Sequence, residues 1–163
     1  MSGGEAGRNP GTGYDATDAA LLRLVQEDAR LTAGQLSERL NLSPSACHRR
    51  LQRLEAAGIV ERTVALLNPR AVGRPTTVFV EISLATQADE VLDAFEAAVA
   101  RIPDVLECHL MTGAYDYLLK VAARDSEDFA LIHRRYLARL PGVAKLQSSF
   151  ALKTVFHTTA LPV

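Results

Sequence analysis

The segment of residues 32–58 carries the start and stop signals of two short helices that are separated by a tight turn. Thr32 stands three residues before a glutamine, which is the spacing of a capping box, where each side chain accepts from the other residue's backbone N–H. Asn41 suits the left-handed position that ends a helix, and Ser43 followed by Pro44 suits the start of the next one. The pattern predicts a helix–turn–helix.

The second predicted helix divides into an apolar stripe and a basic surface. Cys47, Leu51 and Leu54 share the stripe at helical spacing, and no acidic residue interrupts the helix before Glu55. Arginine suits DNA because its planar guanidinium can bind guanine O6 and N7 or two phosphate oxygens. A basic helix face can also be merely solvated, but the caps and the short turn favour DNA binding. The candidate DNA-contacting residues here are Ser43, Pro44, Ser45, His48, Arg49, Arg50 and Arg53.

Flanking segments complete a winged arrangement. Asp15 is the expected N-cap of an earlier helix, with an apolar side facing the helix–turn–helix. After Gly58, which suits a helix end, residues 59–67 alternate roughly between apolar and polar, as expected for a wing strand. Arg62 on this wing is a further candidate contact to a phosphate, or a solvated side chain. Residues 14–67 are therefore the expected winged helix–turn–helix domain.

The composition limits where and how such a chain can act. Of its 163 residues 48% are hydrophobic, and the formal net charge of −1 gives no general positive field, so DNA contact must rely on local charge. Cys47 and Cys108 fall inside predicted regular elements, which favours a reducing cytoplasm over a disulfide framework. Residues 1–13 are polar and glycine-rich, as in a disordered tail, and no apolar run is long enough to cross a membrane. We expect a cytoplasmic protein without a membrane partner.

The second half of the chain predicts a ferredoxin-like domain. Proline and glycine in residues 68–75 mark a linker, and residues 76–163 follow with the order strand, helix, strand, strand, helix, strand. The expected fold class is thus α+β, with an N-terminal winged helix–turn–helix and a C-terminal βαββαβ domain. Right-handed crossovers put both helices on one sheet face. Since the strand at residues 117–121 is apolar on both sides, we expect a second copy to cover the other face in a homodimer.

Motifs in both halves resemble the Lrp/AsnC family of bacterial and archaeal regulators. These motifs are LSPSACHRRLQRLEAAGIV, LLNPRAVG, TGAYDYLLKV and LPGV. The similarity runs from about Asp15 to Thr158 and is nearest to the leucine-responsive branch of the family. It implies a nucleoid-associated transcription factor that binds double-stranded DNA as dimers, assembles into larger rings such as octamers, and responds to a small amino acid.

The same resemblance implies an effector pocket between subunits, around the turn that joins the second and third strands of the C-terminal domain. A glycine turn exposes backbone groups to a carboxylate, and the Asp116 carboxylate can attract an ammonium, although Gly113 and Asp116 could also serve only a tight hairpin. Ala114 replaces a frequent acid and Ser148 a frequent threonine, which leaves affinity and ligand choice open. The candidate effector-binding residues are Leu110, Met111, Thr112, Gly113, Ala114, Tyr115, Asp116, Ser148, Ser149 and Phe150.

Two other classes of protein remain as alternatives. An effector-independent architectural protein that coats DNA would share the arginine helix, and Ala114 is the one feature that supports it. An enzyme would need a recognisable catalytic motif, and the sequence has no nucleophile elbow, zinc-protease helix or phosphate-binding loop. The neighbouring pairs Cys47–His48 and Cys108–His109 point to different faces of their elements, so they do not form a zinc site. We therefore expect neither catalysis nor a metal or other cofactor.

Overall fold

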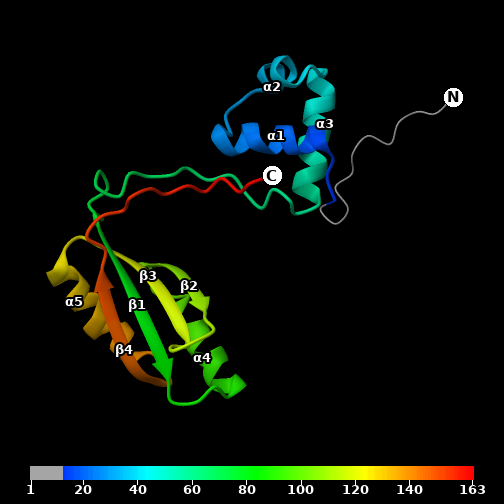
Figure 1. Ribbon diagram of the computed structural model, residues 1–163. Coiled ribbons are helices and arrows are strands. Elements are labelled where there is room, and N and C mark those ends of the chain that lie inside the picture. Colours follow the sequence, from blue (N-terminus) through cyan, green and yellow to red (C-terminus); the bar gives the residue numbers. More distant parts are fainter. Residues whose placement is uncertain (1–12) are drawn as a thin grey trace. The chain divides into compact units, whose positions relative to one another are not determined.

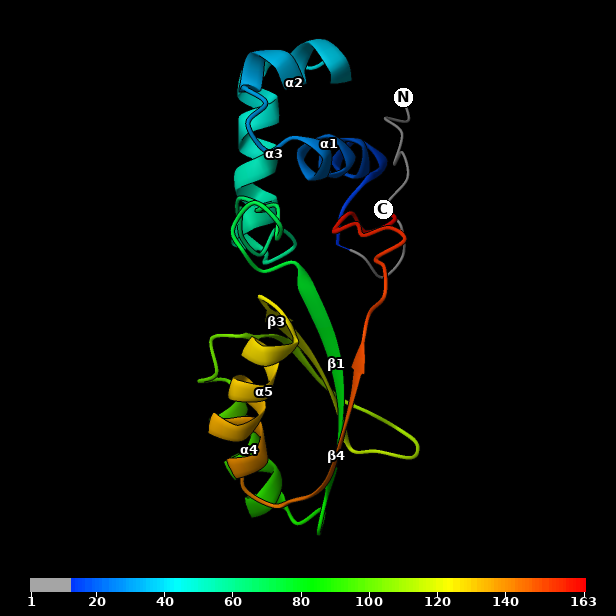
Figure 2. The same cartoon turned by 90° about the vertical axis from the view of Figure 1, so that its left-hand side faces the viewer.

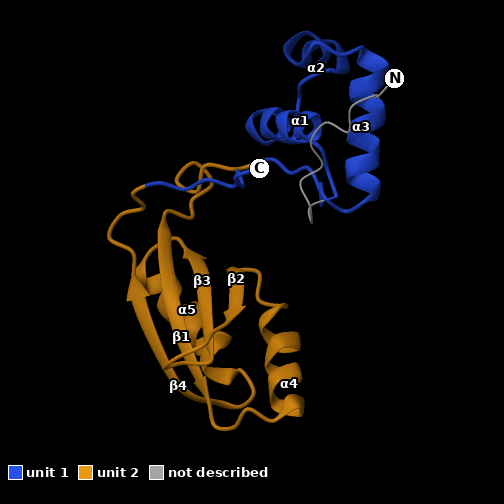
Figure 3. Ribbon diagram, turned by 45° about the vertical axis from the view of Figure 1, so that its right-hand side comes forward, with its two compact units in different colours: residues 1–65, 156–163 blue, residues 66–155 orange. Residues whose placement is uncertain are grey.

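The computed structural model of the chain describes residues 13–163, which form two compact units (Figures 1 and 3). One unit extends to Ala65 and also includes Phe156–Val163, and the other spans Leu66–Val155. Residues 156–163 thus group with the first unit, whereas the sequence analysis assigned them to the C-terminal domain. The tail expected at residues 1–13 lies outside the described residues except for Gly13.

The first unit contains the expected helix–turn–helix. Its helices are α1 (Ala16–Glu27), α2 (Ala33–Leu40) and α3 (Pro44–Ala56). The capping box at Thr32 is present, Asn41 ends α2 at a φ of 52°, and Ser43 caps α3 with Pro44 in its first turn, so these predictions are confirmed. All three helices contact one another. Their shared core consists of the buried side chains of Leu21, Leu22, Leu36, Cys47 and Leu54.

The strand predicted for the wing is wrong. Ile59 and Val60 pack against the core of the first unit, but residues 61–68 have no regular secondary structure and are exposed. A strand is stable only when its N–H and C=O groups pair with a neighbouring strand. Within the described residues every strand belongs to the sheet of the second unit, so this segment has no partner. Residue alternation alone was therefore not enough to form the wing strand.

The second unit has the expected order of strands and helices. Its elements are β1 (Thr76–Leu84), α4 (Asp89–Val99), β2 (Val105–Leu110), β3 (Tyr117–Ala123), α5 (Ser126–Arg135), a 3₁₀ turn (Leu137–Arg139) and β4 (Val143–Phe150). The strands form an antiparallel sheet in the order β2-β3-β1-β4. This confirms the ferredoxin-like prediction. The last strand ends at Phe150, opposite Val78, rather than near residue 156; the Ala151 N–H still donates to the Thr77 carbonyl oxygen at 3.0 Å, and β1 itself begins at Thr76.

The two faces of the sheet differ in what covers them. Both α4 and α5 lie on one side, and the other side carries no helix of the second unit (Figure 2). Alternate residues of β1 and β3 are fully buried under these helices: Val78, Val80, Ile82, Leu119 and Val121. On the opposite face Phe79 of β1 is 38% exposed, although phenylalanine is one of the residue types that are most often buried. Burial by the chain's own helices therefore leaves one face of the sheet bare.

Candidate functional site

The exposed surface of α3 begins at its N-terminal cap. The Ser43 side-chain oxygen accepts from the Ala46 N–H at 3.2 Å, and it lies 3.1 Å from the Ser45 hydroxyl oxygen. From Ser45 onward, exposed side chains recur at spacings of three and four residues, which places them on one outward face. This face, called the outer face of α3 below, consists of Ser45, His48, Arg49 and Gln52.

Sequence reasoning missed Gln52. Its side chain is exposed and lies one turn beyond His48 and Arg49, so the same helical spacing that selected those residues also selects it. A glutamine amide can donate to and accept from adenine in the major groove. Gln52 was left out because the candidates were chosen largely by their positive charge and not by their position on the helix.

Arg50 and Arg53 do not belong to the outer face. The Arg50 Nη1 atom donates to Asp15 Oδ2 at 2.8 Å and to Asp18 Oδ1 at 2.7 Å, and Arg53 Nη2 donates to Asp18 Oδ2. Asp18 is completely buried and also accepts from the Asp15 backbone N–H at 3.0 Å, which completes the capping box of α1. The structure thus joins two acids of α1 to two arginines of α3.

The electrostatic effect of this network is visible at Asp15 and Arg50. Burial acts to raise the pKa of the Asp15 carboxyl, but the hydrogen bonds from Arg50 and from the Asp18 N–H outweigh it and lower that pKa. The hydrogen bonds to Asp15 and Asp18 raise the pKa of Arg50. Both shifts keep the pair ionised. Sequence reasoning missed the partner role of Asp18, although its spacing to Leu21 and Leu22 placed this acid on the buried stripe of α1.

The remaining candidate DNA contact, Arg62, lies in the irregular segment that follows α3. It is exposed, and no strand of the described structure fixes its position. The structure therefore brings Ser43, Pro44, Ser45, His48 and Arg49 together along one helix, turns Arg50 and Arg53 towards α1, and leaves Arg62 apart.

The candidate effector turn, residues 111–116, closes the hairpin between β2 and β3. The Met111 N–H donates to the Asp116 carbonyl oxygen at 2.8 Å. Asp116 also binds the end of β1, because its Oδ2 accepts from the Leu84 N–H at 2.7 Å and its Oδ1 accepts from Gln87 Nε2 at 2.6 Å. Gly113 has a φ of +130°, a conformation that side chains with a Cβ rarely adopt. Asp116 thus takes part in the hairpin and ties it to the end of β1, with each carboxylate oxygen accepting one hydrogen bond.

The other effector candidates lie on β4, which β1 separates from β3 in the sheet. Ser148 pairs with Val80, and Phe150 pairs with Val78, so both share the helix-covered face. The Phe150 ring meets the Phe129 ring edge-on at a centroid distance of 5.3 Å. Ser149 alternates to the open face. Because the turn and β4 belong to non-adjacent strands, one chain does not bring the two sets of candidates together.

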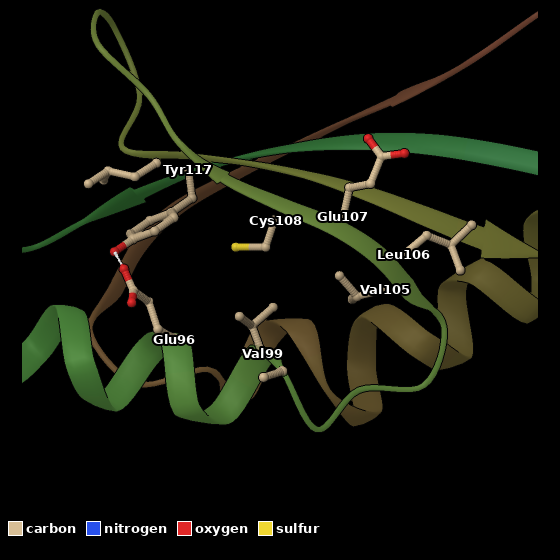
Figure 4. Close-up of a pocket in the computed structure, with 9 residues that line it drawn as sticks. Glu96, Val99, Val105, Leu106, Glu107, Cys108 and Tyr117 are labelled. Atoms are coloured by element: carbon tan, nitrogen blue, oxygen red, sulfur yellow. Dashed lines mark hydrogen bonds between the residues drawn. The ribbon is translucent and has the colours of Figure 1, made fainter. Parts of the chain in front are cut away.

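A separate cavity of about 370 Å³ opens between α4 and the edge strand β2 (Figure 4). Inside it the Tyr117 hydroxyl donates to Glu96 Oε1 at 2.7 Å, and Cys108 lines the wall. Burial raises the pKa of the Cys108 thiol to about 11, so this group is protonated and a poor nucleophile at neutral pH. Leu110 is the one effector candidate that borders this cavity.

Residues 13–163 contain no cluster of His, Cys, Asp or Glu side chains with the arrangement of a metal site. No helix in this part of the chain combines the length and the apolar character needed to cross a membrane.

Family models match both halves of the chain. Residues 14–61 match a winged helix-turn-helix DNA-binding domain, and residues 77–161 match the Lrp/AsnC ligand binding domain. The leucine-responsive regulatory protein of Salmonella typhimurium is 36% identical over 156 residues, which cover 96% of this chain and 95% of that protein. An uncharacterised helix-turn-helix transcriptional regulator of Sinorhizobium fredii is 34% identical over 149 residues, with 91% and 88% covered.

Solved structures agree with these relatives. A transcriptional regulator of Neisseria meningitidis, in a complex with L-Met, has a TM-score of 0.87 and 43% identity, covering 91% of this chain and 96% of its own. An AsnC family regulator of Agrobacterium tumefaciens has a TM-score of 0.88 and 36% identity, covering 91% and 97%. The observed fold, a helix–turn–helix followed by a βαββαβ domain, is consistent with the family models and with these relatives. The chain therefore belongs to the Lrp/AsnC family of DNA-binding transcriptional regulators.

Proposed function

We propose that this regulator reads DNA with the outer face of α3 and responds to a small apolar amino acid bound between copies of its C-terminal domain. The observation that carries the proposal is the separation of the effector candidates: the turn at residues 111–116 and the β4 residues 148–150 lie on different strands, with β1 between β3 and β4. A pocket that uses both sets needs a second copy of the chain.

The DNA contact begins at the N-terminal end of α3. The positive end of the helix dipole there favours a phosphate, with Ser43 and Pro44 at the contact. Along the outer face Ser45, Arg49 and Gln52 supply polar groups for base edges, and His48 lies beside them. Arg62 is exposed and can supply a contact to a phosphate, whereas Arg53, although 52% exposed, is tied to Asp18.

The effector site uses the turn and β4 from different chains. Residues 112–114 are exposed, so their backbone groups and those of Met111 and Tyr115 are suited to the amino acid's carboxylate and ammonium. Asp116 holds the turn, because both of its oxygens are already hydrogen-bonded. Ser148, Ser149 and Phe150 come from the other chain, and Leu110 borders the site. The L-Met found in the Neisseria meningitidis relative supports an apolar amino acid.

The bare sheet face supports a homodimer. Phe79 lies opposite Lys120 of β3, but the flanking β3 residues on this face, Leu118 and Ala122, are apolar, and a second sheet laid against them would remove this apolar surface from water. Dimers would then assemble further, up to an octamer, and place two α3 helices about one turn of DNA apart, roughly 34 to 36 Å. We infer that the assembly acts at the nucleoid, in the cytoplasm, without catalysis or a resident cofactor.

A second candidate function is architectural DNA binding without an effector. It is favoured by Asp116, because the Leu84 N–H and the Gln87 amide already bind its carboxylate and give it a structural role at the end of β1. Ala114 adds no charge to replace it.

Isothermal titration calorimetry of the full chain against a panel of L-amino acids separates the two candidates. We expect saturable heat with L-Met, L-Leu or a similar apolar amino acid, and none with L-Asp. Electrophoretic mobility shifts on the same preparation verify that it binds DNA. If a preparation that binds DNA gives no heat of binding with any amino acid of the panel, the architectural function is supported instead.

A further inference from the structure

The first turn of α1 and the middle of α3 share a network of opposite charges. Asp18 is completely buried, and its carboxylate accepts from Arg50, from Arg53 and from the Asp15 backbone. The Asp15 carboxylate accepts from Arg50 as well. Two negative and two positive groups therefore neutralise each other within the unit that reads DNA.

The three arginines of α3 differ in consequence. Arg49 lies on the outer face and, within the described part of the chain, makes no ion pair. Arg50 is 26% exposed with one nitrogen shared between two acids, and Arg53 is tied through one nitrogen to the same buried carboxylate. An arginine held in this way has fewer donors left for phosphates, and its charge is offset by the acid beside it.

We propose that Asp18 is a positioning residue that sets the DNA specificity of the regulator, because it keeps Arg50 and Arg53 on α1 and away from the phosphate backbone. This inference rests on DNA binding through α3. Phosphate contacts carry no sequence information and supply nearly all of the affinity for non-specific DNA, whereas base contacts discriminate. Withholding two arginines from phosphates lowers non-specific affinity and leaves discrimination to the outer face of α3.

A purely structural role predicts a different outcome. If Asp18 only stabilised the first unit, its replacement would weaken binding to all DNA in proportion to the fraction of unfolded protein. If Asp18 restrains two arginines, its replacement releases them, and binding to non-specific DNA becomes tighter. The direction of the change in non-specific affinity therefore distinguishes the two roles.

The test measures specific and non-specific DNA binding of Asp18→Asn by fluorescence anisotropy over a range of salt concentrations. We expect non-specific affinity to rise by about threefold to tenfold, with the slope of log affinity against log salt steeper by about one to two per subunit. Specific affinity depends mainly on the outer face of α3 and should change less, so the ratio of specific to non-specific affinity should fall by up to about tenfold. The matched control is Asp28→Asn, which removes the same charge from the other end of α1, where Asp28 pairs with the exposed Arg30.

Asp15→Asn is the second variant, in case Asp18→Asn does not fold. Asparagine caps helices as well as aspartate does, so α1 keeps its start, while Arg50 loses one of its two acids. This variant should show the same changes at roughly half their size, about one additional unit of salt slope or less. Unchanged or weaker non-specific binding by folded Asp15→Asn would overturn the proposal for Asp18. A wild-type chain that binds no DNA would instead overturn the function on which it rests.

Discussion

The recognition helix α3 and the β2–β3 turn are both set by local signals, but they differ in how much of a binding surface one chain provides. The outer face of α3 lies on a single helix, whose start is fixed by Ser43 and Pro44. The turn is as well defined, through Gly113 and Asp116, yet its companion residues on β4 lie across β1. A DNA-binding surface on one helix is complete in a single chain. A ligand pocket formed by strands of two chains, as we propose, exists only after the chains associate.

The largest effect should come from charging the bare sheet face. Phe79→Arg places a cation where we propose that a second sheet packs, so association should weaken by at least about 30-fold, or about 2 kcal/mol. Amino-acid binding should disappear with the assembly, while α3 remains intact. Analytical ultracentrifugation and calorimetry measure the two losses.

Ala97→Arg is the matched control, because it adds the same charge at an exposed position of α4. This variant should assemble and bind ligand as the wild type does. If Phe79→Arg stays assembled, or loses assembly and still binds an amino acid, the pocket does not depend on the sheet face.

The next effect should come from the outer face of α3. Arg49→Ala should weaken specific DNA binding by about 1 to 3 kcal/mol if the side chain reads a base, and should flatten the salt slope if it meets a phosphate. Gln52→Ala should reduce specific binding without changing the slope, because the side chain is neutral. Mobility shifts at several salt concentrations measure both. Wild-type affinity in both variants would exclude this face of α3 as the reading surface.

A smaller effect should follow from loosening the turn. Asp116→Ala removes both acceptor oxygens, so the hydrogen bonds from the Leu84 N–H and the Gln87 amide are lost. We expect a loss of about 1 to 2 kcal/mol in the stability of the second unit and weaker ligand binding, with DNA affinity nearly unchanged. Chemical denaturation and calorimetry test this. DNA affinity that falls together with ligand affinity would show that the two regions are not separable.

The smallest effect should be the acid sensitivity of the first unit. The pKa of Asp15 lies below its ordinary value of 3.8, so its ion pair with Arg50 contributes stability that is complete above that value. This contribution is lost as the pH falls through the lowered, folded-state pKa. Asp15→Asn should therefore flatten the dependence of unfolding temperature on pH below about 4. Identical pH profiles for the variant and the wild type would exclude a stabilising ion pair at Asp15.

The sequence predicted the elements whose causes are local. Thr32, Asn41 and Ser43 act within a few residues of themselves, and the period-two pattern of β1 reports burial on one face, so these elements have the expected places. What the sequence did not predict depends on partners that are distant in the chain. A wing strand at residues 59–67 needed a neighbouring strand, and the ion pair of Arg50 joins it to Asp18, which lies 32 residues away.

The candidate effector site was predictable only where it depends on local sequence signals. The hairpin and its glycine follow from local turn chemistry, and the structure shows them at residues 111–116. The role of Asp116 depended on Leu84, which comes from another strand and could not be read from the turn itself. We propose that the turn meets β4 of a second copy, which the amino-acid sequence indicates only through family resemblance.

Complementation between two defective chains tests most directly whether the ligand site is shared between copies. Gly113→Ala strains the turn, and Ser148→Ala combined with Ser149→Ala removes both hydroxyls of β4; each protein alone should bind no amino acid. After the two are mixed, unfolded and refolded together, half of the dimers are mixed, and one of the two sites in each is intact. Calorimetry should then find about one quarter of the wild-type sites. No recovery in mixed dimers would show that turn and strand do not meet between chains.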